Sequence, residues 1–520
     1  MRPTTASPSS KRWERIDGVA IGLIAFLTLV HTVLALRLPL APDETYYWDW
    51  SRSLDWGYYD QGPVIALIIR ASTMLLGTSE IGVRAGIIAC STATLWLIFR
   101  AARRLFGPRA GLAGVGLSGL TPMGVAGGFV ATYDIPMALA WAWALWAASG
   151  LVVPDSGKAG ESDRRDPLRW ITIGVALGVG ILSKYSMVLF VPCLFLWLVD
   201  SPEQRWRLRT YGPWLALGIA LMVNLPNLGW QSQNDWPTFR HMFHLTDKGI
   251  DRTVLRRFGD FLGSQAGLMT PLLFLGMVAA LADAWKRRRR DPRLAFACWL
   301  SAPVLLFFAL QTLKSKVEAN WAILGWIGAA VAYAGWVWGE GTGSSRRRQK
   351  YGATALAFAA VLTTLTAWPE LRLAVGIRIP ARWDQSRKMY GGRELAKACQ
   401  SEMARMHEVS GCRPVLVSTT YDVTARLAFY APGQPRTFCL FLGTRDNQYR
   451  YWNSRAGLRP GGCALIVERV VRDPINPPDY GSVFDRVETI DPPVAIRVPR
   501  LYTEPALEYR LYRAWGYHPH

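Results

Sequence analysis

The sequence is poor in acidic residues and in the motifs that identify nucleic-acid-binding proteins. Asp and Glu number 38 against 59 Lys and Arg, so the formal net charge is +21. The basic residues stand in short clusters between apolar runs and no nucleic-acid motif accompanies them, which excludes nucleic acid as the partner. No Gly-rich phosphate loop and no internal repeat stand out either. The lack of a repeat argues against a transporter built from two related halves.

Long apolar runs dominate what the sequence does contain. Hydrophobic residues make up 51% of the 520 residues, and 24 residues are Trp. The first run follows basic residues but precedes no small-residue cleavage site, so it is interpreted as a retained anchor rather than a signal peptide. The runs predict an α-helical polytopic membrane protein with about eleven transmembrane helices. These spans are expected at 18–36, 81–99, 110–130, 135–153, 171–198 (two short helices meeting near Ser183 and Lys184), 214–228, 268–284, 294–313, 321–338 and 354–367.

The positions of the basic clusters indicate the orientation of the chain. Clusters of Lys and Arg at 100–109, 158–169, 205–209, 286–293 and 346–350 all follow even-numbered spans. Because cytoplasmic loops carry an excess of Lys and Arg, these loops are expected inside. The prediction is a multi-pass protein of a bacterial inner membrane. Its N-terminus at 1–17 is expected to be cytoplasmic, its membrane domain lies at 18–367 with a first periplasmic loop at 37–80, and residues 368–520 form a periplasmic domain.

The tail after residue 367 has a different composition from the rest. Charges occur throughout, and short apolar runs at 414–418, 437–442, 464–467 and 495–498 are separated by Gly and Pro, which predicts strands with helices between them. About 150 residues are enough for a separate core. Cys399, Cys412, Cys439 and Cys463 allow one or two disulfides in an oxidising compartment, and buried free thiols are the alternative. The tail is therefore predicted to be a soluble α/β domain.

The first predicted outer loop combines aromatic and acidic side chains. Residues 43–60 include seven aromatic residues and five carboxylates. An interfacial helix would explain the aromatic residues, since Trp and Tyr favour the headgroup level, but it would not explain the acids beside an anionic lipid surface. Aromatic rings next to a carboxylate suit sugar binding, and on a helix Asp43 and Tyr47 share one face. The candidate site residues of this loop are Asp43, Glu44, Tyr58, Tyr59 and Asp60.

A second polar constellation lies at the outer end of the third and fourth predicted spans. Asp134 stands there, and an acid at membrane depth is costly enough to be a functional candidate by default. Capping of the fourth helix, with Pro136 in its first turn, is the alternative, and both roles can hold together. Arg84 and Lys184 supply positive charge near the same face and need partners. An anionic lipid phosphate and a structural ion pair are the two partners considered.

Two further polar segments are expected at the outer face. Residues 224–236 are rich in Asn and Trp, and residues 314–321 read Lys-Ser-Lys-Val-Glu-Ala-Asn-Trp. Helix capping and interface anchoring would account for such residues without any function. Because all the polar segments fall on the side where the tail is expected, Lys316, Glu318 and Asn320 are counted as candidate substrate-binding residues.

Together these segments resemble the polyprenyl-phosphate-dependent GT-C glycosyltransferases. The resemblance rests on the acidic pair Asp43 and Glu44, on Asp134, on the Ser183–Lys184 hairpin and on the segment 316–321, and it covers the whole membrane part. The branch it resembles most is glycosyltransferase family 39, the protein-mannosyltransferase-like group. Lipid A aminoarabinose transferases and rhizobial galacturonosyl transferases are more distant. Tail segments 421–430 and 447–452 also look like the bacterial members.

The resemblance implies an inverting transfer of a sugar from undecaprenyl or a similar phosphate to a cell-envelope acceptor. Asp43 would take the proton of the acceptor hydroxyl or bind the acceptor, helped by a partly dry site that raises its pKa. Lys184 and Arg84 would face the charge that develops on the leaving lipid phosphate. Asp60 and Asp134 would orient the sugar or the acceptor, or hold a divalent cation, which the family does not uniformly need.

Several alternatives stay open at this point. The aminoarabinose branch has Glu-Lys where Asp60 and Gln61 stand here, which leaves that branch's phosphate contact and substrate open for this chain. A transporter or flippase for lipid-linked glycans and a non-catalytic glycan-binding or assembly protein are two other classes. An O-antigen-type polymerase or ligase is a third, enzymatic one, with a lipid-linked oligosaccharide as donor. The acceptor is a lipid, a polysaccharide or a protein.

Overall fold

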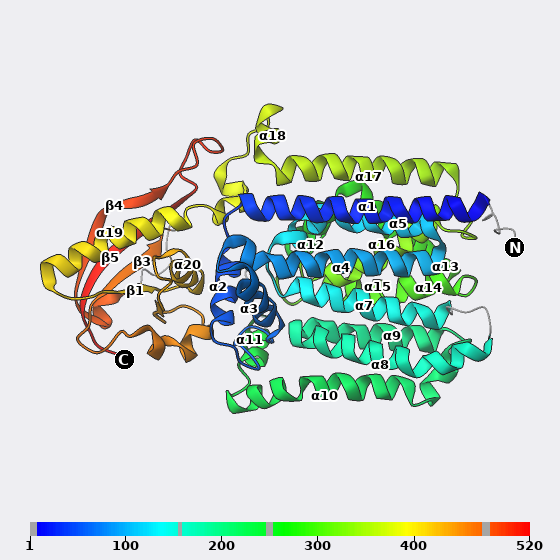
Figure 1. The fold of residues 1–520 in the computed structure, drawn as a ribbon, viewed down its shortest axis with the longest axis horizontal. Coiled ribbons are helices and arrows are strands. Elements are labelled where there is room, and N and C mark those ends of the chain that lie inside the picture. The colour runs from blue at the N-terminus through cyan, green and yellow to red at the C-terminus, as the bar shows by residue number, and fades with distance from the viewer. Residues whose placement is uncertain (1–7, 154–158, 246–252, 471–478, 520) are drawn as a thin grey trace, which may run out of the picture. The chain divides into compact units, whose positions relative to one another are not determined.

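A computed structural model describes residues 8–153, 159–245, 253–470 and 479–519 of the chain (Figure 1). Residues 1–7 of the predicted cytoplasmic N-terminus and Lys158 of a predicted inside cluster lie outside these ranges. The chain divides into two compact units. Unit 1 comprises residues 1–34, 61–65 and 85–368, and unit 2 comprises residues 35–60, 66–84 and 369–520. Most of the first predicted outer loop therefore shares a compact unit with the C-terminal tail.

Unit 1 is helical, and many of its helices run along one common direction (Figure 1). α8 packs against both α7 and α10, and α16 packs against α5 and α13. The core between them is built from Ala, Leu, Trp and Phe side chains. The elements are α1 (Pro8–Arg37, its last residues in unit 2), α4 (Glu80–Phe106, from Ala85 on), α5 (Pro108–Gly119), α6 (Pro122–Phe129), α7 (Asp134–Val152), α8 (Ala159–Ser183), η1 (Tyr185–Leu189), α9 (Phe190–Asp200), η2 (Arg205–Arg209), α10 (Gly212–Gln233), α11 (Pro237–Leu245), α12 (Val254–Met269), α13 (Pro271–Arg287), α14 (Pro292–Trp299), α15 (Ala302–Gln311), α16 (Ile323–Trp338) and α17 (Arg346–Ala367).

The helices of unit 1 include several that suit a bilayer. Five segments in the described part of the chain are long and apolar enough to cross a membrane: Trp13–Arg37, Glu80–Phe106, Asp134–Val152, Asp166–Ser183 and Pro292–Gln311. Two bent helix pairs raise the number to seven if each is one span. Large apolar side chains such as Phe26 and Leu29 are more than half exposed, as lipid-facing residues are. The polytopic helical class is confirmed, and the count of eleven spans stays a prediction.

Two of the predicted spans are bent, because the helix breaks within them. The span expected at 110–130 is divided into α5 and α6, which meet at 74°, and the one at 268–284 begins inside α12, which meets α13 at 104°. In both places Thr precedes Pro: Thr121 caps α6 by accepting a hydrogen bond from the amide of Gly124 at 3.1 Å, and Thr270 has a φ of 66°. Proline ends the preceding helix and starts the next. The expected break at Ser183 and Lys184 is confirmed.

Unit 2 contains a five-stranded mixed sheet in the order β2-β1-β3-β5-β4. β1 is parallel to β2 and β3, whereas β5 is antiparallel to β3 and β4. α19 and α20 pack on the sheet with a core of Leu, Val and Cys, which confirms the α/β tail. The elements of unit 2 are α2 (Pro42–Ser51), α3 (Val64–Leu76, from Ala66 on), α18 (Pro369–Ala374), η3 (Ala381–Trp383), η4 (Gln385–Met389), α19 (Gly392–Ser410), β1 (Val415–Ser418), α20 (Tyr421–Tyr430), β2 (Phe438–Cys439), η5 (Gln448–Tyr451), η6 (Asn453–Ala456), β3 (Ala464–Arg469), η7 (Tyr480–Ser482), β4 (Phe484–Ile496) and β5 (Leu507–Tyr517).

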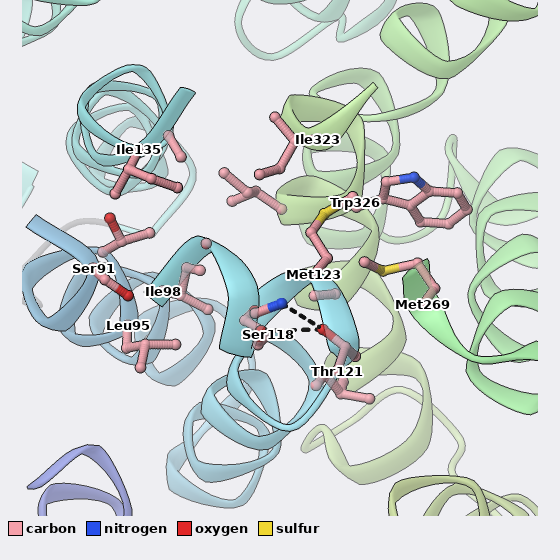
Figure 2. A pocket seen from close by; sticks show the side chains of 17 residues that line it. Ser91, Leu95, Ile98, Ser118, Thr121, Met123, Ile135, Met269, Ile323 and Trp326 are labelled. Atoms are coloured by element: carbon pink, nitrogen blue, oxygen red, sulfur yellow. Dashed lines mark hydrogen bonds between the residues drawn. The ribbon is translucent and has the colours of Figure 1, made fainter. Parts of the chain in front are cut away.

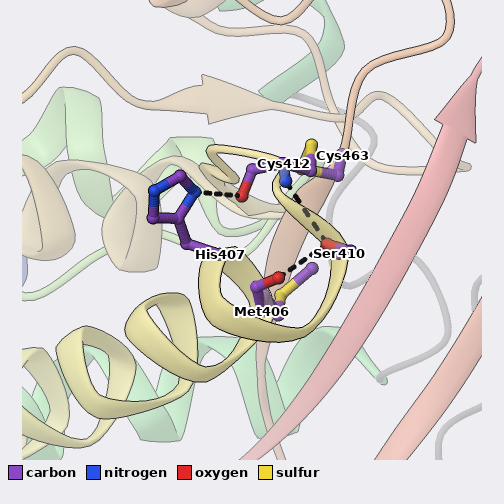
Figure 3. The surroundings of a disulfide bond; sticks show 5 residues. All are labelled: Met406, His407, Ser410, Cys412 and Cys463. Atoms are coloured by element: carbon purple, nitrogen blue, oxygen red, sulfur yellow. Dashed lines mark hydrogen bonds between the residues drawn. A yellow bond between two sulfur atoms is a disulfide. The ribbon is translucent and has the colours of Figure 1, made fainter.

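One disulfide bond joins two of the four tail cysteines. Cys412, just after the end of α19, is bonded to Cys463, just before β3 (Figure 3). Cys399 and Cys439 are buried free thiols, and burial raises the pKa of Cys439 to about 11 and that of Cys399 to about 12. Both alternatives considered from the sequence are therefore realised, each by two of the cysteines.

Candidate functional site

The acidic and aromatic loop residues of unit 2 stand on a short helix, α2. Pro42 begins the helix, and the Glu44 side chain accepts a hydrogen bond from the amide of Ala41 at 2.7 Å, which satisfies one of the free donors of the first turn. Every residue from Glu44 to Ser51 is buried. Asp43, in contrast, keeps an exposed side chain. The helix thus fixes its aromatic side chains in the core of unit 2 and leaves one carboxylate at the surface.

Glu44 and Arg84 form a buried, two-bonded ion pair. Arg84 Nε lies 2.7 Å from Glu44 Oε1 and Arg84 Nη2 lies 2.6 Å from Oε2, and both side chains have no exposed area. The guanidinium also donates to the carbonyls of Ala35, Leu38 and Pro39 at 2.6–3.1 Å. All five N–H groups of Arg84 therefore have acceptors inside the protein. Of the two partners considered from the sequence for Arg84, a lipid phosphate and a structural ion pair, the structure shows the ion pair.

Asp43 accepts a hydrogen bond from a tyrosine of the C-terminal tail. Tyr421 Oη, at the start of α20, lies 3.0 Å from Asp43 Oδ1. The surrounding protein raises the pKa of Asp43 by removing water from the carboxylate, even though the side chain keeps exposed surface. The hydrogen bond from Tyr421 lowers that pKa in part, the charges of Asp422 and Asp60 raise it, and the charge of Arg445 lowers it. The balance keeps the pKa of Asp43 above its ordinary value.

Asp60 lies in the same cluster and has partners on both carboxylate oxygens. Tyr46 Oη donates to Asp60 Oδ2 at 2.9 Å, and Arg445 Nη2 donates to Oδ1 at 3.0 Å. The guanidinium of Arg445 also lies over the ring of Tyr421, 5.0 Å from its centroid. Asp43 and Asp60 are therefore joined through two residues of the tail, Tyr421 and Arg445.

The two candidate tyrosines of the loop have different surroundings. Tyr58 is fully buried and stacks on Trp50 with ring centroids 4.3 Å apart, while its hydroxyl lies 3.1 Å from the carbonyl oxygen of Ser53. Tyr59 is half-buried, and its amide donates to the side chain of Gln448 at 2.7 Å. Tyr58 is thus a core residue of unit 2, and Tyr59 keeps an accessible ring.

A second buried carboxylate, Asp49, was not singled out from the sequence. Tyr449 Oη donates to it at 2.7 Å, Arg52 Nη1 lies 3.1 Å away and Arg436 Nη1 lies 3.5 Å away. Burial raises the pKa of Asp49 against the lowering effect of these three partners. Because the tyrosine and one arginine come from the tail, Asp49 fastens α2 to the rest of unit 2.

Unit 1 contains a separate polar cluster around Asp134, the first residue of α7. Lys184 Nζ lies 2.7 Å from Asp134 Oδ1, and Asn320 Nδ2 lies 2.7 Å from Oδ2. The ammonium group also lies 5.0 Å from the centroid of the Tyr133 ring. Lys184 reaches this position because the chain leaves α8 there in an extended conformation. The structure therefore brings together three residues that the sequence named separately.

The other two candidates of unit 1 are Lys316 and Glu318. In the described part of the chain, neither is hydrogen-bonded or ion-paired to Asp134, Lys184 or Asn320. Lys316 Nζ and Glu318 Oε1 lie 3.0 Å apart in a pair whose side chains are 40% and 51% exposed. Such a pair contributes little to stability in water.

The Asn-rich segment predicted at the outer face makes buried hydrogen bonds in unit 1. Tyr185 donates to Asn227 at 2.6 Å, and Gln231 donates to Tyr185 at 3.1 Å, which gives this segment a packing role.

An apolar cavity of about 80 Å³ lies at the break between α5 and α6 (Figure 2). Its lining side chains come from α4, α5, α6, α7, α12 and α16, among them Ile135, Met269 and Trp326. The lining residues with polar side-chain atoms are Ser91, Thr94, Ser118, Thr121 and Trp326. The cavity has no titratable side chain and offers no group for acid–base chemistry.

The sequence left two features open, namely whether a metal ion binds and which residues of the tail belong to the site. Among the side chains that the structure describes, no group of three or more His, Cys, Asp or Glu residues could hold a metal ion. Tyr421 and Arg445 were not named as site residues. The resemblance of segments 421–430 and 447–452 to bacterial relatives was the available signal for the tail.

The comparisons with known proteins agree with the resemblance drawn from the sequence. Residues 60–230 match the family model described as dolichyl-phosphate-mannose-protein mannosyltransferase. The lipid A galacturonosyltransferase RgtD of Rhizobium johnstonii is 32% identical over 294 residues, which cover 56% of this chain and 59% of that protein. An undecaprenyl phosphate-alpha-4-amino-4-deoxy-L-arabinose arabinosyl transferase of Proteus mirabilis is 26% identical, over 57% of this chain and 56% of its own length. The chain thus spans less than two thirds of the length of these curated relatives.

A solved structure matches nearly the whole chain. ArnT from Cupriavidus metallidurans bound to undecaprenyl phosphate superposes with a TM-score of 0.62 and 17% identity, covering 96% of this chain and 98% of that one. The apo state of the same protein gives a TM-score of 0.60. At this identity the likeness concerns the fold. The chain has the fold of ArnT. The resemblance stated from the sequence is confirmed by the matching family model and the curated relatives.

Proposed function

We propose that the protein is an inverting glycosyltransferase that moves a sugar from a polyprenyl-phosphate donor to a cell-envelope acceptor. One observation carries the proposal: α2 buries every residue from Glu44 to Ser51 but leaves Asp43 exposed, with a pKa raised above its ordinary value. An accessible carboxylate of this kind is suited to accept a proton near neutral pH. The named activities of RgtD and of the Proteus mirabilis enzyme support the same reaction class.

Asp43 acts as the general base in this proposal. The acceptor hydroxyl loses its proton to the Asp43 carboxylate while its oxygen bonds to the anomeric carbon of the sugar. The bond between that carbon and the phosphate oxygen breaks, and the lipid phosphate leaves with the electron pair, which inverts the anomeric configuration. A raised pKa makes Asp43 a stronger base without preventing its ionisation above that pKa.

The charge on the leaving phosphate needs a fixed cation. We assign this role to Lys184, since Asp134 fixes its ammonium group and is itself held by a hydrogen bond from Asn320. Arg84 is a poorer candidate because its five N–H groups already have acceptors within unit 2. In this proposal Glu44 and Arg84 support the position of α2 and do not touch the substrate. Asp60 and Tyr59 of unit 2 orient the sugar. Within unit 1, Lys316, Glu318 and Asn320 are the residues proposed to bind the lipid substrates.

The relatives' names support a proposal for the acceptor and the donor sugar. RgtD acts on lipid A by its name, so an amphiphilic lipid of that class is the proposed acceptor. The arabinosyl transferase is named for an undecaprenyl-phosphate donor, so the proposed donor carries the same lipid phosphate. A galacturonosyl and an aminoarabinosyl donor are the two sugars to compare.

The proposed location is the bacterial inner membrane, with the N-terminus cytoplasmic and the tail periplasmic. The Cys412–Cys463 disulfide supports an oxidising compartment for the tail. The basic clusters between the apolar runs support the same orientation. An alkaline phosphatase fused after residue 520 is expected to be active, and a fusion in the loop at 286–293 is expected to be inactive. The reverse pattern would contradict the orientation.

The test of the function is sugar transfer in membranes from cells that express the wild type, Asp43→Asn or Asp55→Asn. Asp55 is a matched control because it is an exposed carboxylate of the same loop, and its side chain accepts a hydrogen bond from the amide of Trp56 at 2.8 Å. Labelled polyprenyl-phosphate galacturonic acid and aminoarabinose are offered with lipid A, at equal protein levels. Wild type and Asp55→Asn should transfer label, and Asp43→Asn should not. Absence of transfer by the wild type, or full activity of Asp43→Asn, would favour a transporter.

A further inference from the structure

Asp43 and four other residues of unit 2 form a series of contacts that begins and ends on α2. Tyr421 donates to Asp43, Arg445 lies over the Tyr421 ring and donates to Asp60, and Asp60 accepts from Tyr46. Tyr46 stands one helical turn from Asp43 on α2, so the series returns to the helix where it began. Two of its members come from α2, one from the loop that follows, and two from the C-terminal tail.

The position of Tyr421 is fixed from several sides. Its ring lies 4.6 Å from the ring of Tyr46, centroid to centroid, and 5.0 Å from the Arg445 guanidinium. Asp60 holds Arg445 in turn, at 3.0 Å. Because these contacts fix the ring, they also fix the hydroxyl oxygen, which lies 3.0 Å from Asp43 Oδ1. The tail thus presents a preorganised donor to an otherwise exposed carboxylate.

We propose that Tyr421 is a positioning residue for Asp43 and that the C-terminal tail thereby completes the base of the reaction. The Tyr421 hydroxyl donates a hydrogen bond to Asp43 Oδ1 and so orients the carboxylate. Oδ2 is then the oxygen that accepts the proton of the acceptor hydroxyl. Arg445 keeps Tyr421 in place and does not itself contact the reacting atoms. The inference rests on the proposed function, in which Asp43 is the base, and adds to it the role of the tail.

The charges around Tyr421 and Asp43 determine in which direction each substitution shifts the pKa of Asp43. Burial and the neighbouring Asp43 carboxylate raise the pKa of Tyr421, so the hydroxyl stays a donor. Tyr421 lowers the pKa of Asp43, whereas the charge of Asp422 raises it; Asp60 also raises it and Arg445 lowers it. Removing the Tyr421 hydroxyl should therefore raise the pKa of Asp43, and neutralising Asp422 should lower it. The catalytic form of Asp43 is the ionised one, so the acid limb of the activity profile moves with this pKa.

The experiment compares the pH dependence of kcat/KM for wild type, Tyr421→Phe, Asp422→Asn and Tyr512→Phe. Tyr512→Phe is the matched control, since Tyr512 also donates to a carboxylate of the tail, Glu468, at 3.3 Å. All four are full-length proteins purified in detergent and assayed with polyprenyl-phosphate galacturonic acid or aminoarabinose, whichever the wild type uses. Thermal unfolding midpoints check that the variants are folded.

We expect the acid limb to move to higher pH in Tyr421→Phe, to lower pH in Asp422→Asn, and to stay in place in Tyr512→Phe. At low pH the kcat of Tyr421→Phe should fall about tenfold, as the loss of a hydrogen bond to a charged group implies, with KM for the donor little changed. A loss of folded protein would not produce shifts of opposite sign. Unshifted profiles, or shifts in one direction for both variants, overturn the inference while the transfer reaction stands. An inactive wild type overturns the proposed function itself.

Discussion

The buried pair of Glu44 and Arg84 allows a sharp test of whether these residues support the fold or bind substrate. Replacing Arg84 by Met keeps much of the side-chain volume but removes the five N–H donors. The Glu44 carboxylate would keep the hydrogen bond from the Ala41 amide but lose its counter-charge, and three backbone carbonyls would lose their arginine donors, where neither side chain of the pair has exposed area. The variant is expected to be unstable because an unpaired buried charge is costly.

The expected magnitude follows from the burial of the pair. Breaking a fully buried ion pair by removing one partner costs about 3–5 kcal/mol of the free energy of unfolding. The exposed pair of Lys316 and Glu318 is the matched comparison, with side chains 40% and 51% exposed. Losing an exposed pair costs about 0–1 kcal/mol. In the double variant Glu44→Gln with Arg84→Met, no charge is stranded, so part of the lost stability should return.

The assay is the thermal unfolding midpoint of full-length protein in one detergent, together with the fraction that elutes as a single species in gel filtration. Arg84→Met should unfold at a clearly lower temperature than Lys316→Met, and the double variant should lie between Arg84→Met and the wild type. If Arg84→Met were as stable as Lys316→Met but inactive, the arginine would be a substrate-binding residue and the structural assignment would be wrong.

Three other predictions concern stability. Cys412→Ser should lower the unfolding midpoint, because the disulfide closes a long loop and contributes about 2–4 kcal/mol; a reductant should destabilise the wild type and leave this variant unchanged. Gly62→Ala should reduce the yield of folded protein, because a Cβ there would lie 2.0 Å from the Leu182 carbonyl oxygen, whereas Gly229→Ala meets nothing within 4 Å and serves as the control. Asp384→Asn tests how the ionised Asp384 carboxylate contributes to stability. Burial raises the pKa of Asp384, but hydrogen bonds from Ser386 and Arg372 outweigh this effect and leave the pKa below its ordinary value. That contribution is present above the unfolded pKa and disappears as pH falls through the folded one, so the variant should differ from wild type at neutral pH and converge with it in acid.

The secondary structure was largely predictable, because apolar runs and turn residues act locally. The α/β tail and the break at Lys184 follow from such local signals. The breaks at Thr121 and Thr270 were missed because hydropathy averages over a window and hides a Thr-Pro pair inside an apolar run. A capping residue followed by Pro is the sequence signal of a helix start, and it was present in both places.

The candidate site was predictable only residue by residue. Asp134 and Lys184 were each named from the cost of charge at membrane depth, but nothing in the sequence says that residues 50 positions apart form an ion pair. Tyr421 and Asp43 are 378 positions apart, and their contact depends on the packing of the tail with α2 in unit 2. Exposure could not be predicted either, and it is exposure that distinguishes Asp43 from its buried neighbour Glu44.

The measurement that tests the account most directly is the release of polyprenyl phosphate by purified protein in liposomes. Polyprenyl-phosphate galacturonic acid or aminoarabinose is the donor and lipid A the acceptor, and both products are quantified by mass spectrometry. Wild type and Asp55→Asn are expected to release polyprenyl phosphate and to transfer sugar at the same rates as each other. In Asp43→Asn both rates should fall about 10²-fold or more, which is the range for removal of a general base. Release and transfer by Asp43→Asn at the wild-type rate, or donor moved across the bilayer without being cleaved, would contradict the account.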